Sequence, residues 1–195
     1  MERNFFSLPS YSLGDDAGFR RPSQPRVGLE SPALTVMTDL MRVAPATIGP
    51  EASIETANQF MMTRGVRLLL VVDERECVLG VISTTDTLGE RPLRVAADRG
   101  LRRDELVVAD VMTSAERVEV IALAEVEGAR VGHVVATLMH AGRHHALVVD
   151  SDAESGRLMV RGILALSQAA RQLGEPLQLS EVARTFAEIE AVLSR

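Results

Sequence analysis

Hydroxyl and carboxyl side chains are concentrated in one short segment of the chain, Gly80-Val81-Ile82-Ser83-Thr84-Thr85-Asp86. The pattern predicts a strand that ends at Ile82 and a helix that Ser83 opens. A helix N-terminus offers free backbone N–H groups and a positive dipole end, which suit a phosphate. Hydroxyls can add donors to phosphate oxygens, and Asp86 can accept from two ribose hydroxyls. The segment therefore indicates a nucleotide site, unless Ser83 and Asp86 only cap the helix and offset its dipole.

The residues before this segment predict the elements that must position it. We expect a short helix over 34–41, a short extended piece over 46–50, a helix from Ser53 to about Arg64, and strands over 68–72 and 77–82. Gly65 stands where a left-handed helix cap is required. The run Leu68-Leu69-Leu70-Val71-Val72 is apolar on both faces, which is typical of a buried strand.

The same elements recur later in the chain. Three landmarks repeat in order: Thr38–Met41 in Ala109–Met112, Leu70–Asp73 in Leu147–Asp150, and Leu79–Ile82 in Arg161–Leu164. Their offsets are 71, 77 and 82 residues, so we expect the second copy to carry insertions in its loops. An internal repeat of this kind predicts two diverged copies of one small α/β unit.

Composition limits the classes of protein and of partner. Hydrophobic residues make up 46% of the 195 residues and aromatic residues only 3%, so the core must be aliphatic. The formal net charge of −6 argues against nucleic acid as a partner. The single cysteine, and the lack of a membrane-spanning or secretory segment, lead us to expect a cytoplasmic protein that does not enter membranes.

The ordered set of motifs resembles the CBS domain, and its repetition resembles a CBS pair, or Bateman module. The resemblance is carried by Val36–Met41, Val71–Asp73 and Gly80–Asp86 in the first copy, and by Val108–Met112, Val148–Asp150 and Arg161–Ile163 in the second. It implies an α/β (α+β) fold of two β-α-β-β-α units packed about a pseudo-twofold axis. The expected division is a disordered tail over 1–33, a first unit over 34–90, a linker helix over 91–106, a second unit over 107–174 and a C-terminal helix over 175–195.

The resemblance also implies a ligand and a site. CBS pairs commonly bind AMP, ADP, ATP or S-adenosylmethionine in clefts between their copies, and two pairs often stack as a homodimer. By the family's pattern, Ser83, Thr85 and Asp86 would contact phosphate and ribose in the first copy. Adenine would then slot between apolar strands beside Thr47, Ile48, Val66 and Arg67.

The second copy departs from this pattern. Ala165 stands where Ser83 stands in the first copy, and Gln168 where Asp86 stands. A phosphate hydroxyl and the ribose carboxylate are both missing. The second cleft is therefore either empty or reads a ligand differently, by Arg143, His144 and Arg161.

Residue patterns for metal binding and catalysis are not found. His140 and His144 straddle the helix end at Gly142, so they do not form a ligand pair on one helix face, and no cysteine or paired carboxylates join them. The sequence contains no Walker loop and no nucleophile elbow, and Cys77 lies in a predicted strand. We therefore expect no metal, no required cofactor and no enzymatic activity.

Two functions remain open from the sequence. The first is a homodimeric regulatory module that binds an adenosine derivative in the cleft of the first unit and signals to an effector protein that the sequence does not identify. The second is a structural or interaction CBS pair without a ligand, which acts through dimerisation and its terminal segments.

Overall fold

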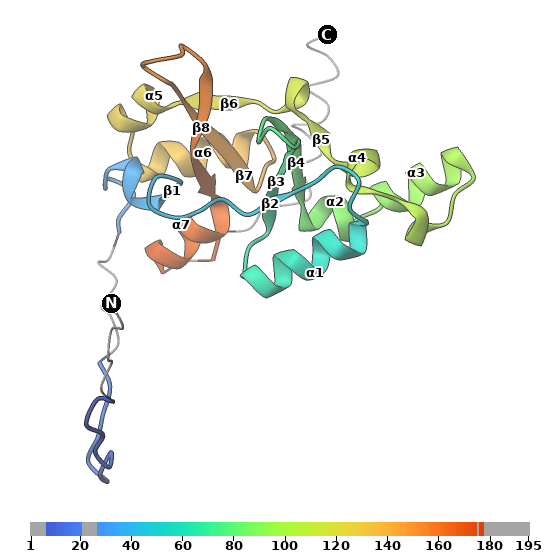
Figure 1. The fold of residues 1–195 in the computed structure, drawn as a ribbon. Coiled ribbons are helices and arrows are strands. Elements are labelled where there is room, and N and C mark those ends of the chain that lie inside the picture. The colour runs from blue at the N-terminus through green and yellow to red at the C-terminus, as the bar shows by residue number, and fades with distance from the viewer. Residues whose placement is uncertain (1–6, 21–26, 175, 178–195) are drawn as a thin grey trace.

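Two four-stranded sheets form the centre of the molecule (Figure 1). The structure, a computed structural model, describes residues 7–20, 27–174 and 176–177. Within these ranges the strand orders are β2-β3-β4-β5 and β1-β8-β7-β6, with helices against both sheets. The predicted fold of two similar α/β units is confirmed. The predicted helix over 175–195 lies outside the described residues except for 176–177.

Each sheet and its helices form one unit. Unit 1 contains β2 (Thr47–Ile48), α1 (Ile54–Arg64), β3 (Leu68–Val72), β4 (Val78–Ser83), α2 (Thr84–Leu88), α4 (Val108–Val111) and β5 (Thr113–Ser114). Unit 2 contains the 3₁₀ helix η1 (Ala33–Val36), β1 (Met37–Asp39), β6 (Val120–Ala122), α5 (Leu123–Gly128), α6 (Val131–His140), β7 (His145–Ser151), β8 (Leu158–Ala165) and α7 (Leu166–Leu173). Between the units the chain forms α3 (Arg91–Arg99) and the 3₁₀ helices η2 (Arg103–Glu105) and η3 (Ala115–Arg117). The linker predicted as one helix over 91–106 is therefore divided into α3 and η2, because Gly100 ends α3 with a φ of 65°.

The two units exchange their first strands. β1 comes before unit 1 in the sequence, yet it pairs with β8 of unit 2. β5 comes before the rest of unit 2, yet it pairs with β4 of unit 1. The units in space therefore do not follow the division of the sequence at residues 34–90 and 107–174, because each sheet is completed by a strand from the other half of the chain.

The pairing register corrects one landmark of the repeat. Thr38 lies opposite Ile163 and Thr113 lies opposite Val81, so Thr38 corresponds to Thr113, an offset of 75 residues. The predicted match of Thr38–Met41 with Ala109–Met112 is therefore wrong. The helix predicted over 34–41 is also wrong: η1 ends at Val36 and the chain continues as β1, because pairing with β8 overrides the local helical pattern.

The other landmarks of the repeat agree with the structure. Gly65 ends α1 with a φ of 64°, and Gly142 follows α6 with a φ of 61°. The central antiparallel pairs, β3–β4 and β7–β8, each contain one register shift, after Val71 and after Val148. These paired features keep the predicted offset of 77 residues.

Both faces of the central strands are buried, as the apolar run over 68–72 predicts. Leu68 and Leu70 pack against Leu147 of unit 2, so they lie between the two sheets. Leu69 and Val71 alternate with them and pack in the core that unit 1 forms with its helices. The alternation of neighbouring side chains thus joins each strand to two cores.

Two glycines allow the exchanged strands to lie against their sheets. A Cβ atom on Gly80 would stand 2.2 Å from the backbone oxygen of Thr113, in β5. A Cβ atom on Gly162 would stand 2.5 Å from the Met37 sulfur and 3.0 Å from the Thr38 oxygen, in β1. The first obstacle is backbone, whereas the nearest atom to Gly162 belongs to a flexible side chain.

We predict that Gly80→Ala destabilises the protein more than Gly162→Ala. The backbone of β5 must move for the first substitution, at a cost of more than about 3 kcal/mol, whereas Met37 can partly yield to the second, at about 1–3 kcal/mol. Urea unfolding of the two variants measures this difference. Gly128→Ala is the control, because nothing lies within 4 Å of its added Cβ. Equal losses for Gly80 and Gly162 would contradict the prediction.

Candidate functional site

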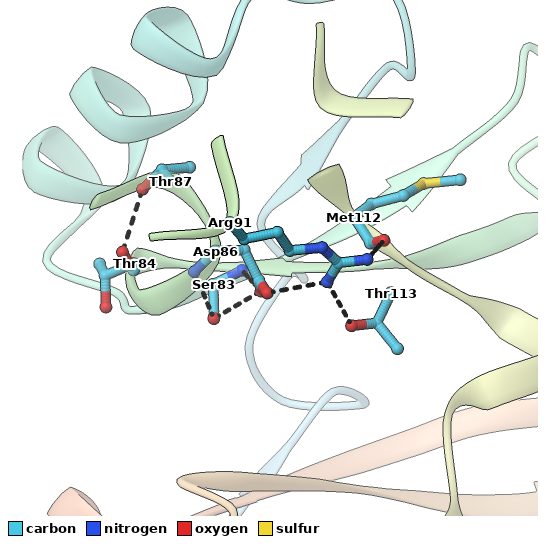
Figure 2. A network of polar contacts seen from close by, with 7 residues as sticks. All are labelled: Ser83, Thr84, Asp86, Thr87, Arg91, Met112 and Thr113. Atoms are coloured by element: carbon cyan, nitrogen blue, oxygen red, sulfur yellow. Dashed lines mark hydrogen bonds and ion pairs between the residues drawn. The ribbon is translucent and has the colours of Figure 1, made fainter. Parts of the chain in front are cut away.

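Ser83 and Asp86 form a closed hydrogen-bond cap at the start of α2 (Figure 2). The Ser83 backbone N–H and hydroxyl both donate to Asp86 Oδ2, at 2.8 and 2.6 Å. The Asp86 backbone N–H donates to Ser83 Oγ at 3.4 Å. The capping role that the sequence left open is therefore present, and it fixes the Asp86 carboxylate at the junction of β4 and α2.

Arg91 links this carboxylate to the exchanged strand. Its Nη1 lies 3.2 Å from Asp86 Oδ1 and 3.5 Å from the Thr113 hydroxyl. Its Nη2 donates to the backbone oxygen of Met112 at 2.8 Å. Figure 2 shows the guanidinium group between Asp86 on one side and Met112 and Thr113 on the other. One arginine thus holds the start of β5 against the capped junction.

The short helix α2 has little to offer a phosphate. It spans only Thr84–Leu88, so its dipole is small. The Thr84 backbone N–H already donates to the Arg67 oxygen at 3.1 Å, and that of Asp86 to Ser83. The phosphate seat that the sequence suggested at this N-terminus would have to compete with these bonds. Side chains are better placed to bind an anion here.

Such side chains line a cleft of about 320 Å³ between the two units. A volume of this size is at the lower end of the range for small-molecule sites. Unit 1 and its exchanged strand contribute Leu68, Val81, Ser83, Thr85, Asp86 and Thr113; the segment before β6 contributes Arg117, Val118 and Glu119; unit 2 contributes Gly142, Arg143, His144, His145, Ala146 and Leu147. The cleft thus has an apolar wall from both sheets and a polar wall with charges of both signs.

The structure brings together two groups that the sequence assigned to different clefts. Ser83, Thr85 and Asp86 share this cleft with Arg143 and His144. The reason is the packing of the sheets: the start of β7 faces the end of β4 across the interface that contains Leu68 and Leu147.

The other predicted site residues lie elsewhere. Thr47 and Ile48 line a separate hollow with Val72 and Asp73. Ile48 pairs with Val71 whereas Ser83 pairs with Leu68, so the two groups lie towards opposite ends of β3.

Val66 and Arg67 lie closer to the cleft without lining it. Val66 packs against the core of unit 1. The Arg67 backbone accepts from Thr84, and its charge acts on His145 of unit 2. The predicted adenine pocket beside Thr47, Ile48, Val66 and Arg67 is therefore not one cavity in the structure.

Arg161 is engaged in a different contact. Both of its terminal nitrogens bond to the Asp39 carboxylate, which joins β8 to β1. The bonds from Arg161, and one from the Met41 backbone, lower the pKa of Asp39. Arg161 lines another cavity together with Gln168 and Arg42. It is thus separated from Arg143 and His144, with which the sequence had grouped it.

The cleft also contains polar residues that the sequence did not assign to a site, among them Thr113, Arg117 and Glu119. Glu119 Oε2 lies 3.0 Å from Arg143 Nη1, in an exposed ion pair. The signal that could have revealed Thr113 was present, since Val36-Met37-Thr38 recurs as Val111-Met112-Thr113. Arg117 ends η3 and Glu119 lies just after it, in a segment whose position only the exchange of strands determines.

His145 is the titratable group of the cleft whose environment is most perturbed. Burial lowers its pKa to about 4, and the nearby charges of His144 and Arg67 act in the same direction. The imidazole is therefore neutral at physiological pH.

Among the described residues, no group of three or more His, Cys, Asp or Glu side chains could hold a metal ion. No helix in those ranges is long and apolar enough to cross a membrane.

Comparison with known proteins gives the class of the fold. Residues 36–92 match the family model of the CBS domain. An uncharacterized conserved protein from Pyrococcus horikoshii has a similar structure, with a TM-score of 0.53 and 21% identity over 79% of this chain and 100% of its own. CBSX2 of Arabidopsis thaliana in complex with AMP has a TM-score of 0.50 and 22% identity, over 72% of this chain and 94% of its own. A CBS-domain containing protein from Agrobacterium tumefaciens has a TM-score of 0.51 and 20% identity, over 74% of this chain and 95% of its own.

Residues 36–92 are therefore a CBS domain, and the chain as a whole has the fold of a tandem CBS pair. The family match lies in the first half of the chain, and the structural matches extend over both units. These matches indicate no catalytic family. No curated protein matches the chain.

We predict that His145→Gln flattens the pH dependence of stability between pH 6.5 and about 4. The folded protein keeps His145 neutral down to about pH 4, whereas the unfolded chain takes up the proton near pH 6.5. The unfolded state therefore binds more protons in this window, and stability is complete above it and falls as the pH falls. Across this window the free energy of unfolding should fall by up to about 3 kcal/mol less in the variant than in the unmodified protein. Urea unfolding at several pH values measures this, and identical profiles would contradict it.

Proposed function

We propose that the chain is a regulatory module that binds an adenosine derivative in the cleft between its units and signals its presence to an effector protein. The observation that carries the proposal is the cleft itself, in which Asp86, Thr85 and Ser83 of unit 1 face Arg143 and His144 of unit 2. A ligand in this position would touch both units. The complex of the similar CBSX2 with AMP supports an adenosine-type ligand.

The chemistry of the cleft suits the parts of such a ligand. Leu68, Val81 and Leu147 offer an apolar wall for adenine. Each carboxylate oxygen has two lone pairs, so Asp86 Oδ1 can accept from a ribose hydroxyl besides Arg91. The cleft therefore accommodates the flat face of adenine and a polar sugar without breaking the cap at Ser83.

Arg91 supplies a route from the ligand to the rest of the molecule. A ribose hydroxyl on Asp86 Oδ1 would weaken the contact of this oxygen with Arg91. The same guanidinium group holds Met112 and Thr113, at the start of β5. Ligand binding would thus change the contacts by which Arg91 holds β5, the strand that unit 1 takes from the other half of the chain. Such a shift requires that the ligand prefer one arrangement of the two units.

We predict that an adenosine derivative binds the purified protein and that Asp86→Asn weakens binding at least about tenfold, because one hydrogen bond to a charged group is lost. Isothermal titration with adenosine, AMP, ADP, ATP and S-adenosylmethionine measures both effects. Gln168→Ala is the matched control, since Gln168 holds the position of Asp86 in the second copy. Its affinity should equal that of the unmodified protein.

Failure of all five compounds to bind would overturn this proposal and favour the alternative, a CBS pair that acts only through protein contacts. The alternative is supported by one observation: both oxygens of Asp86 already have donors within the chain. It predicts that capture of a partner is indifferent to nucleotide and is lost when residues 1–33 or 176–195 are removed. Thermal unfolding of Asp86→Asn without ligand separates a loss of the cap from a loss of binding.

We also propose that the protein is cytoplasmic and forms a homodimer, and exposed apolar side chains on α1, α2 and α3 support the dimer. Met62, Leu88 and Leu93 are 67, 62 and 62% exposed on α1, α2 and α3. Leu93→Lys should shift the sedimentation coefficient from that of a dimer to that of a monomer. Leu158→Lys, at a similarly exposed residue of unit 2, should leave the dimer intact. A monomeric unmodified protein would contradict the proposal.

A further inference from the structure

We infer that the cleft selects phosphorylated adenosine over adenosine and S-adenosylmethionine, with Arg117 as the main phosphate-binding residue and Glu119 as an internal competitor. The inference rests on the proposed function, since it concerns the ligand of the same cleft. It follows from the different partners that equivalent arginines have in the two copies.

Arg117 and Arg42 occupy the same position in the repeat. Arg42 comes three residues after Asp39 at the end of β1, and Arg117 three residues after Ser114 at the end of β5. Asp39 and Ser114 are equivalent, because they pair with Gly162 and Gly80. The turn that follows each strand therefore carries an arginine in both copies.

The two arginines differ in their neighbours. Arg42 Nε lies 3.5 Å from the Asp39 carboxylate. The residue equivalent to Asp39 is Ser114, which has no charge to offer Arg117. Within the described part of the chain, Arg117 makes no ion pair or side-chain hydrogen bond. The cleft that contains Asp86 therefore also contains Arg117, an arginine without a carboxylate partner.

The remaining charges of the cleft are balanced. Asp86 is paired with Arg91, and Glu119 with Arg143. The charge of Arg117 is therefore left uncompensated in a protein whose net charge is −6. A phosphate is attracted to such a site, whereas the sulfonium cation of S-adenosylmethionine is repelled.

Glu119 restricts access to the second arginine. The side chains of Arg143 and Glu119 are 41 and 76% exposed, so solvent screens their ion pair and it is easily exchanged. A phosphate carries more negative charge than a carboxylate and offers more acceptor oxygens. It can replace Glu119 as the partner of Arg143, whereas an uncharged adenosine cannot.

The test compares AMP with adenosine and S-adenosylmethionine by isothermal titration. AMP should bind the unmodified protein at least about tenfold more tightly than the other two, because it adds charge-assisted hydrogen bonds. Arg117→Gln should weaken AMP binding by about tenfold and leave adenosine binding unchanged. Glu119→Gln should strengthen AMP binding several-fold, because the competing carboxylate is removed. Arg42→Gln, the equivalent change in the other copy, should affect neither ligand.

The opposite effects of Arg117→Gln and Glu119→Gln distinguish a role in binding from general destabilisation, which would weaken both ligands in both variants. Adenosine or S-adenosylmethionine binding as tightly as AMP would overturn the inference and leave the proposed function standing. Equal AMP affinity in the unmodified protein and Arg117→Gln would also overturn it. No binding of any of the three would overturn the inference, and if ADP and ATP also failed to bind, the proposed function would fall with it.

Discussion

The close approach of a backbone strand to a glycine is the constraint on which the rest of the structure depends. β5 pairs with β4 at Gly80, and β1 pairs with β8 at Gly162, where an added Cβ atom would stand 2.2 Å from the Thr113 oxygen and 2.5 Å from the Met37 sulfur. Because each of these strands comes from the other half of the sequence, neither sheet is complete without the other half. The two units are therefore interlocked by their backbones as well as packed by Leu68, Leu70 and Leu147.

The position of the cleft follows from this exchange. β5 brings Thr113, and the segment after it brings Arg117 and Glu119, against the capped junction of unit 1. The packing of the sheets brings Arg143 to the same place. The cleft therefore combines residues that lie far apart in the chain. A ligand in the cleft would therefore touch both units at once.

Local patterns predicted much of this fold and only part of its site. The cap at Ser83, the end of α1 at Gly65 and the buried run over 68–72 are set by interactions within a few residues, and the sequence predicted them correctly. The exchange of β1 and β5 depends on pairing across about 120 and 30 residues, which short-range periodicity does not encode. For this reason Arg143 and His144 were grouped with Arg161, and Arg117 and Glu119 were not recognised.

The exchange also makes the beginning of the chain part of the folded core. Residues 33–39 precede unit 1 in the sequence, yet Ala33 and Val36 are fully buried in the core of unit 2. A shortened protein that begins at residue 41 would keep every strand of the first sheet. It would nevertheless leave the hydrogen-bonding edge of β8 open to solvent. An open edge of that kind pairs with other chains, so the shortened protein would tend to aggregate.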